Sequence, residues 1–294
     1  MTDKGSAPTI SIYDKKKRPS DLILLVIIYA CAFLAVLLLV GIIGYVLYRG
    51  LPVIDWQFLS TAQSALNGTF GILPNIINTL YIIVITLVIA TPIGIGAAIY
   101  LNEYSKGGKL VRLIEFTTET LSGIPSIIFG LFGMVFFGGV LKLGFSILCG
   151  SLTLTIMILP IITRTTQEAL KTVPESYRTG ALGIGATKWY MIRTIILPSA
   201  IPGIITGVIL SIGRIVGESA ALLFTAGSGY LMVSNWLTHP LSPGGTLTIQ
   251  MYLSMTKAKY DDAFGIALVL VVIVLAINFL TKVLSRKLDV NKRG

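Results

Sequence analysis

Six apolar runs, each long enough to cross a bilayer, alternate with short polar segments along the chain. The first run, residues 22–48, has 27 residues and no charged side chain. As a helix it would be about 40 Å long, which is enough to cross a hydrocarbon core of about 30 Å with some tilt. The pattern predicts an all-α, polytopic membrane protein with six transmembrane helices. The other five predicted spans are residues 74–101, 117–139 (interrupted by Gly123 and Pro125), 145–163, 197–227 and 263–284.

Lysine and arginine are concentrated in alternate polar segments, and this distribution predicts the orientation of the spans. The segments before residue 22, around residues 106–112 and 164–193, and from residue 282 onward hold 18 of the 23 basic residues. The opposite loops hold four. Because basic loops stay in the cytoplasm, we expect both termini to be cytoplasmic.

The same pattern divides the chain into parts. The basic stretch "KKKRPSD" resembles the positive region of a signal peptide, but the following run is too long and lacks a cleavage site, so we expect a retained first span. The outer loop from Ser228 to Asp262 is predicted to be a lid, a docking surface or a solvated connector. The expected parts are a basic cytoplasmic tail (1–21), the first transmembrane helix (22–48), an extracytoplasmic loop (49–73), a core of five transmembrane helices (74–284) that includes a cytoplasmic loop (164–196), and a basic cytoplasmic tail (285–294).

Composition agrees with a lipid environment. The chain is 54% hydrophobic and only 12% charged, about half the charge of a typical soluble domain. The net charge of +10 lies in clusters between apolar runs, so it favours a positive-inside membrane protein and not a nucleic-acid partner. Cys31 and Cys149 lie within apolar stretches. We therefore expect both to be packing residues and expect neither a disulfide nor a metal site.

Two charged residues interrupt the fifth predicted span, in the stretch "SIGRIVGESAALLFTAG". An ionised side chain at mid-bilayer costs roughly 2.5–3.5 kcal/mol, so Arg214 and Glu218 are predicted to be functional. They are four residues apart and would lie on one helical face. A guanidinium can bind the oxygens of an anion bidentately, and the carboxylate can neutralise it when the anion is absent. The alternative is a structural ion pair that fixes two helices.

The longest cytoplasmic segment, from Arg164 to Pro198, contains helix signals. Pro174 and Glu175 suit a first helical turn, and Gly183 and Gly185 interrupt the segment before the amphipathic "TKWYMIRTII". The pattern predicts two short amphipathic helices, forming either a compact cytoplasmic knob or an interfacial segment on lipid headgroups.

This segment resembles the signature loop of importer-type ABC transporter permeases. The usual form is Glu-Ala-Ala, three residues, Gly, nine residues, Ile, one residue, Leu-Pro. The resemblance implies that the loop docks on a separate ATP-hydrolysing subunit. The Glu-Ala-Ala positions keep only the final alanine, so the contact that the glutamate makes with the ATPase is missing here. The matching positions are Thr179, Gly180, Ala181, Gly185, Ile195, Leu197 and Pro198.

Two further stretches narrow the resemblance. "LSGIPSIIFGLFG" (121–133) and "GRIVGESAALLFTAG" (213–227) are similar to the permeases of the phosphate-specific uptake system, of PstA type. The resemblance implies a multi-pass protein of the prokaryotic cell membrane that imports phosphate. Its implied partners are a PstC-type permease, a dimer of PstB-type ATPase subunits that use ATP and Mg²⁺, and an extracytoplasmic PstS-type phosphate-binding protein. Arg164 matches a second arginine of the family, although an ordinary basic flank is the alternative.

Other functions remain open from the residues alone. The sequence has no G-x-x-x-x-G-K-[ST] phosphate loop, so nucleotide must be bound by another chain and no cofactor is expected here. His239 is the only histidine, which argues against a zinc site or a catalytic triad. The alternatives are a permease for molybdate or sulfate, an intramembrane enzyme that uses Glu218 as a proton carrier, and a self-sufficient anion channel.

Overall fold

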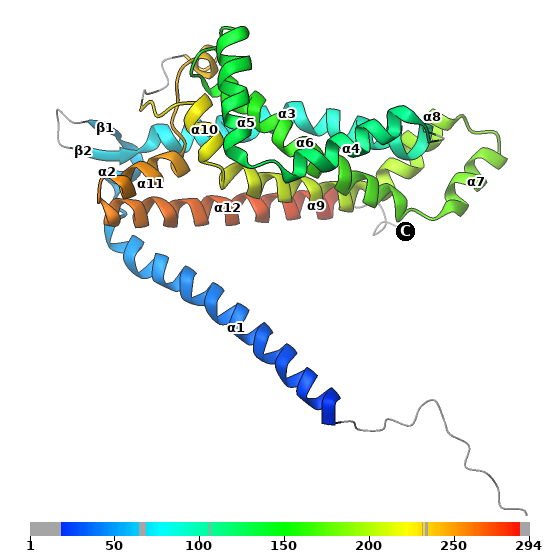
Figure 1. Cartoon of the computed structure of the whole chain (residues 1–294), viewed down its shortest axis with the longest axis horizontal. Helices are drawn as coiled ribbons and strands as arrows, with labels where there is room; N and C mark the ends of the chain where they lie inside the picture. Colours follow the sequence, from blue (N-terminus) through cyan, green and yellow to red (C-terminus); the bar gives the residue numbers. More distant parts are fainter. Residues whose placement is uncertain (1–18, 65–68, 106, 231, 233–234, 289–294) are drawn as a thin grey trace, which may run out of the picture. The chain divides into compact units, whose positions relative to one another are not determined.

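The computed structural model of the chain describes residues 19–64, 69–105, 107–230, 232 and 235–288 (Figure 1). The chain divides into two units, residues 1–48 and 49–294. The described part of the first unit is helix α1 (Pro19–Gly50), which continues into the first two residues of the second unit. Its side chains are exposed along almost the whole run, as expected of a helix surrounded by lipid. Most of the predicted N-terminal tail and residues 289–294 lie outside the described residues.

The second unit is mostly helical. Together with α1, four of its helices are long and apolar enough to cross a membrane, within the part of the chain that the structure describes. A sixth candidate is a pair of helices bent by 106° at Ile124 and Pro125, which confirms the predicted interruption of the third span. The remaining spans are α3 with η2 (Leu73–Ile99, Tyr100–Tyr104), α4 with α5 and η3 (Lys109–Gly123, Ser126–Gly133, Met134–Val140), α6 (Ile147–Lys171), α8 with η4 and α9 (Lys188–Met191, Ile192–Ile196, Leu197–Val216), and α12 (Tyr260–Leu288).

Helix α6 lies at the centre of the second unit and packs against both α3 and α9. Glycines make the close approach possible. A Cβ at Gly94 of α3 would lie 2.7 Å from Ile162 Cγ2, and a Cβ at Gly203 or Gly207 of α9 would collide with Ala169 or Thr165 of α6. These glycines therefore let the helix backbones approach closely, as small residues do in membrane proteins.

The prediction of one unbroken helix over residues 197–227 is wrong. Helix α9 ends at Val216, and the short helix α10 (Ala220–Thr225) begins after a break at residues 217–219. One local and one tertiary hydrogen bond stabilise the break: Glu218 Oε1 accepts from the Ala221 N–H at the start of α10 (3.1 Å), and the hydroxyl of the distant Thr248 donates to the Glu218 carbonyl (3.0 Å). Backbone groups that lose helical partners need such substitutes.

The two segments predicted to be outer loops contain short elements in their described residues. Residues 51–64 and 69–72 form η1 (Leu51–Val53), α2 (Trp56–Ser60) and an antiparallel pair of strands, β1 (Ala62–Ser64) and β2 (Thr69–Ile72), with Ala62 opposite Ile72. The later loop contains η5 (His239–Leu241) and α11 (Leu247–Thr256).

The later loop folds back onto α3. His239 is buried, with Nε2 2.8 Å from Asn78 Oδ1 of α3, and burial lowers the pKa of the imidazole below its ordinary value. The Asn78 amide nitrogen donates to the Gly245 carbonyl (3.2 Å). A buried, hydrogen-bonded segment of this kind is not a solvated connector.

Candidate functional site

The structure brings Arg214 and Glu218 together, although across the break and not along one helix. Arg214 Nη2 lies 3.9 Å from Glu218 Oε2. The carboxylate side chain is 5% exposed, whereas the arginine side chain is 48% exposed in this single chain. The pair thus consists of a fixed, buried anion and a guanidinium that is still accessible to a second anion.

A stripe of residues on α6 leads from this pair to the end of the helix. Arg214 Nη2 also lies 3.9 Å from the sulfur of Met157 on α6. Arg164, Glu168 and Lys171 follow Met157 by seven, eleven and fourteen residues, which places all four on one helical face. Arg164 therefore lies on the face of α6 that contacts Arg214, about 10 Å further along the helix than Met157.

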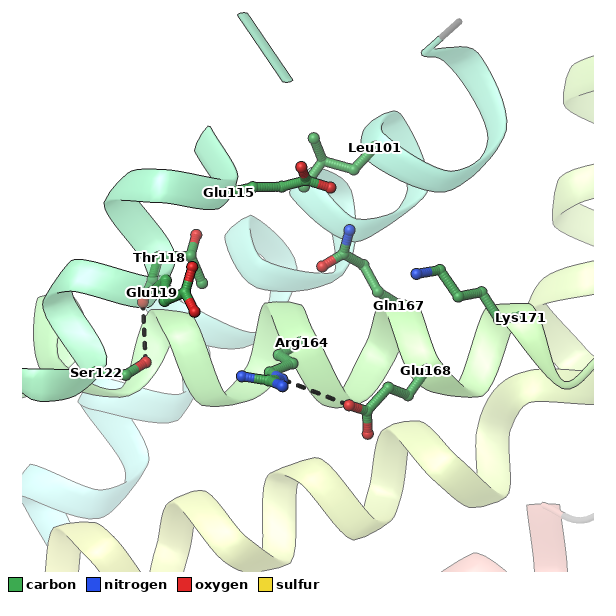
Figure 2. Close-up of a pocket in the computed structure, with 9 residues that line it drawn as sticks. All are labelled: Leu101, Glu115, Thr118, Glu119, Ser122, Arg164, Gln167, Glu168 and Lys171. Carbon is green, nitrogen blue, oxygen red and sulfur yellow. Dashed lines mark hydrogen bonds and ion pairs between the residues drawn. The ribbon is translucent and has the colours of Figure 1, made fainter. Parts of the chain in front are cut away.

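Arg164 lines a polar cavity of about 330 Å³ between α4 and α6 (Figure 2). Its Nε lies 3.5 Å from Glu168 Oε1, and both side chains are exposed. The arginine–glutamate spacing of four residues repeats that of Arg214 and Glu218. The cavity is lined by Leu101, Glu115, Thr118, Glu119, Ser122, Arg164, Gln167, Glu168 and Lys171.

The two carboxylates on the α4 side of this cavity were not predicted from the sequence. Glu115 and Glu119 line the cavity together with Thr118 and Ser122, on the side opposite the polar residues of α6 (Figure 2). The signal was present in the sequence, because residues 115, 118, 119 and 122 have the spacing of one helical face at the beginning of the third span. The cavity wall carries three carboxylates and two cationic groups.

The segment predicted to be cytoplasmic contains two helical stretches, α7 (Glu175–Gly183) and α8, but only α7 is a separate short helix, so the prediction of two short helices is correct for the first and wrong for the second. The second amphipathic stretch is the beginning of the fifth span: Thr187 caps its N-terminus, and the helix runs unbroken from Lys188 to Val216. The π-helical turn η4 comes just before Pro198 and accommodates it. Helix α6, in turn, continues past the predicted end of the fourth span to Lys171.

The residues that match the signature loop occupy distinct positions. Ala181 is buried against α6 in a cluster that includes Leu170 and Met191, whereas Thr179 and Gly180 are exposed. Ile195, Leu197 and Pro198 are half-buried where η4 continues into α9. The alanine that the motif keeps is thus the one that anchors α7.

Gly185 ends α7 in a Schellman motif. The Gly185 N–H donates to the Leu182 carbonyl (3.0 Å) and the Ala186 N–H donates to the Ala181 carbonyl (3.0 Å). Gly185 has φ +86°, a left-handed conformation that favours glycine. The glycine of the motif is therefore required by the local backbone.

Apolar side chains are exposed around the end of α7. Ile184 is 87% exposed, and four aromatic or aliphatic neighbours are about half exposed. An apolar surface of this kind marks a protein or membrane contact. These neighbours are Tyr177, Leu182, Trp189 and Tyr190.

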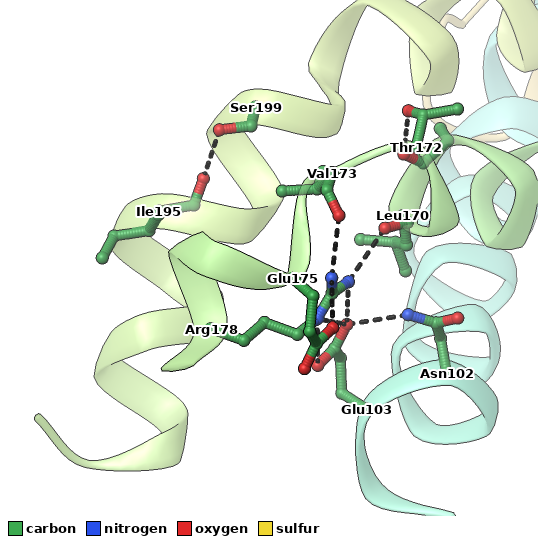
Figure 3. A network of polar contacts seen from close by, with 10 residues as sticks. Asn102, Glu103, Leu170, Thr172, Val173, Glu175, Arg178, Ile195 and Ser199 are labelled. Atoms are coloured by element: carbon green, nitrogen blue, oxygen red, sulfur yellow. Dashed lines mark hydrogen bonds and ion pairs between the residues drawn. The ribbon is translucent and has the colours of Figure 1, made fainter. Parts of the chain in front are cut away.

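A buried ion pair joins α7 to the end of the second span (Figure 3). Arg178 Nη2 lies 2.9 Å from Glu103 Oε1 of η2, and the side chains are 13% and 4% exposed. The hydrogen bond to Glu103 raises the pKa of Arg178 above its ordinary value. The sequence did not single out either residue, because no local pattern connects positions 75 residues apart.

Comparison with known proteins places these features in a family. Residues 90–293 match the family described as the binding-protein-dependent transport system inner membrane component. The chain belongs to this family. Membership implies a membrane subunit that works with a second permease, an ATPase and a binding protein.

Two relatives and one solved structure are similar over most of the chain. The probable ABC transporter permease protein YqgI of Bacillus subtilis is 36% identical over 89% of this chain and 95% of that protein. The phosphate transport system permease protein PstA of Xylella fastidiosa is 34% identical over 78% of this chain and 80% of its own length. The fold matches a bacterial alginate ABC transporter bound to its periplasmic protein, with a TM-score of 0.67 and 17% identity over 92% of this chain and 96% of that one.

These findings confirm the family prediction. The chain is a multi-pass membrane protein with the fold of ABC importer permeases, and it is a transporter subunit and not an enzyme. The comparisons do not favour the alternative of an intramembrane enzyme.

Proposed function

We propose that this chain is the PstA-type permease subunit of an ATP-driven importer of inorganic phosphate. The proposal is supported by relatives named as phosphate transport permeases, which are 32–37% identical to it. The observation that carries it is the pair of Arg214 and buried Glu218, 3.9 Å apart, beside the charged face of α6.

The pair explains how phosphate is admitted without being retained. Glu218 is held by the Ala221 N–H, so its carboxylate stays in place while the half-exposed guanidinium of Arg214 remains accessible. Phosphate oxygens fit the guanidinium fork and take over from the carboxylate as its partner, and Glu218 neutralises the arginine again when the anion leaves. Competition between two anions keeps binding weak enough for transport.

Arg164 and Glu168 form a second arginine–glutamate pair along the proposed path, nearer the cytoplasm in the predicted orientation. The cavity around them has more carboxylates than cations, because Glu115 and Glu119 face it from α4. An anion that reaches this cavity meets a net negative wall, which favours its release. The path therefore runs along α6 from Arg214 to Lys171.

The proposed assembly follows from the family. This chain pairs with a PstC-type permease and receives phosphate from a PstS-type binding protein on the outer side of the inner membrane. A dimer of PstB-type subunits binds ATP and Mg²⁺ and docks on α7, with the exposed residues from Thr179 to Gly185 at the contact. Both termini lie in the cytoplasm.

Transport by the reconstituted complex tests the proposal. The four kinds of subunit are purified together and placed in proteoliposomes, and uptake of radiolabelled phosphate, sulfate and molybdate is measured with and without ATP. We expect ATP-dependent uptake of phosphate alone. Uptake of sulfate or molybdate in its place would contradict the substrate, and uptake by this chain without an ATPase would contradict the mechanism.

A further inference from the structure

Arg178 connects three elements of the chain, and its guanidinium is fully used (Figure 3). Nε and Nη2 donate to the Glu103 carboxylate at 2.9–3.4 Å. Nη2 also donates to the carbonyl of Leu170 on α6, and Nη1 donates to the carbonyl of Val173 in the segment that follows α6, each at 2.9 Å. Asn102 donates to the same carboxylate (2.7 Å), so Glu103 is held from both sides.

Few other contacts fix α7. The helix has nine residues, and Ala181 is its single buried side chain. The flanking segments, residues 172–174 and 184–187, are short, and the Schellman motif at Gly185 shapes only the end of the helix. The orientation of α7 against α3 and α6 therefore depends mainly on Arg178.

We infer that Arg178 and Glu103 are a positioning pair that makes α7 move together with α3 and α6. The inference rests on the proposed docking of the ATPase at α7. When the ATPase moves α7, the ion pair carries that displacement into the end of the second span, and the bond to the Leu170 carbonyl carries it into the end of the fourth. Without the pair, α7 can turn on its flanking segments while the spans stay in place.

The pair lies next to a departure from the family motif. Thr179 stands where the motif has its glutamate, so the carboxylate of that position is absent from α7. The adjacent Arg178 instead points inward and holds α7 to the chain's own spans. The connection between the docking helix and the membrane is made inside the permease.

The test must separate positioning from folding. Removing one member of a buried ion pair leaves an unpaired buried charge, so Arg178→Gln alone can disturb the loop. The double variant Glu103→Gln/Arg178→Gln removes both buried charges. Glu175, whose Oε2 lies 3.2 Å from Arg178 Nη1, also loses its partner, but its side chain is 74% exposed and stays hydrated. Arg193→Gln, at an exposed cation of η4 in the same region, is the matched control.

The measurement is the amount of oxyanion imported per ATP hydrolysed by the purified complex in proteoliposomes. We expect the double variant to keep its ATPase subunits and its ATP hydrolysis while this ratio falls by about tenfold, a typical size for coupling between sites. Arg193→Gln should keep the ratio of the unmodified complex.

Two outcomes would overturn the inference. One is an unchanged ratio in the double variant. The other is loss of the ATPase from the purified complex, because the pair would then support docking and not transmission. A wrong substrate in the proposed function is recognised separately, since the unmodified complex would then import no phosphate and the ratio is measured with the oxyanion that it does import.

Discussion

Arg214 is the residue on which the proposed pathway depends, because its guanidinium is accessible while its partner Glu218 is buried. We predict that Arg214→Gln leaves the complex assembled but lowers phosphate uptake by about 100-fold, since charge-assisted, bidentate bonds worth roughly 3 kcal/mol are lost. Arg214→Lys should restore only part of the activity, because an ammonium lacks the planar fork. Uptake into proteoliposomes at equal protein content measures the effect.

The control for this variant is another arginine–carboxylate pair of the same chain. Arg49 and Asp261 lie 3.1 Å apart and both are well exposed, so Arg49→Gln should change uptake less than about twofold. Normal transport by Arg214→Gln would exclude a pathway role and leave a structural ion pair as the explanation.

Substituting alanine for Gly185 or for Gly183 should have opposite effects on the stability of α7. Gly185→Ala places a Cβ on a residue with φ +86° and should weaken the end of α7 by about 1 kcal/mol. Gly183→Ala lies within α7 in open space and should strengthen the helix by a similar amount. Hydrogen exchange of the α7 amides should therefore become faster in the first variant and slower in the second. Equal exchange in both would show that the Schellman motif does not hold the helix.

At the scale of elements, the apolar runs predicted the spans well, because burial in lipid requires long uncharged helices whatever their neighbours. They failed at residues 217–219. A run of small and apolar residues contains no sign that the Thr248 hydroxyl will bind the Glu218 carbonyl from a distant helix. Breaks stabilised by tertiary contacts are invisible in a local pattern.

The candidate site was also predictable only where a local pattern in the sequence marked its residues. Arg214 and Glu218 stood out because charge within an apolar run is costly. Their proximity agrees with their spacing of four residues, but they meet across a break and not on one helical face as expected. Glu103 and Arg178 did not stand out, because each lies in an ordinary polar segment and only the fold brings them together. Glu115 and Glu119 were partly predictable. Their helical spacing can be read from the sequence, but the sequence does not show that they face α6.

Helix packing makes a prediction of its own. A Cβ at Gly94 would contact Ile162 of α6 too closely, whereas a Cβ at Gly96, on the same helix, has nothing within 4 Å. Gly94→Leu should lower stability by about 1–3 kcal/mol through overpacking, and Gly96→Leu should leave it nearly unchanged. Thermal unfolding of the purified chain in detergent compares the two. If the Gly96 variant were the less stable one, the packing of α3 on α6 would be wrong.

At the scale of the whole molecule, orientation in the membrane is a prediction from charge alone. Cys31 and Cys149 are first replaced by alanine, and single cysteines are then introduced by Lys257→Cys in the outer loop or Arg193→Cys near α7. We expect a membrane-impermeant maleimide to label the first variant in intact cells and the second only after the membrane is opened. The reverse pattern would invert the topology and place α7 away from ATP.

The continuity of the fifth span has a mechanical consequence. Lys188, beside the docking helix, and Arg214 belong to one unbroken helix about 40 Å long, whereas Glu218 lies beyond its end and is tied to α10 and α11. A displacement of the Lys188 end of this helix along its axis is therefore expected to move the guanidinium relative to the carboxylate. Under the proposed function, the 3.9 Å distance between the two groups would change when the ATPase moves α7, and with it the strength with which Arg214 binds the anion.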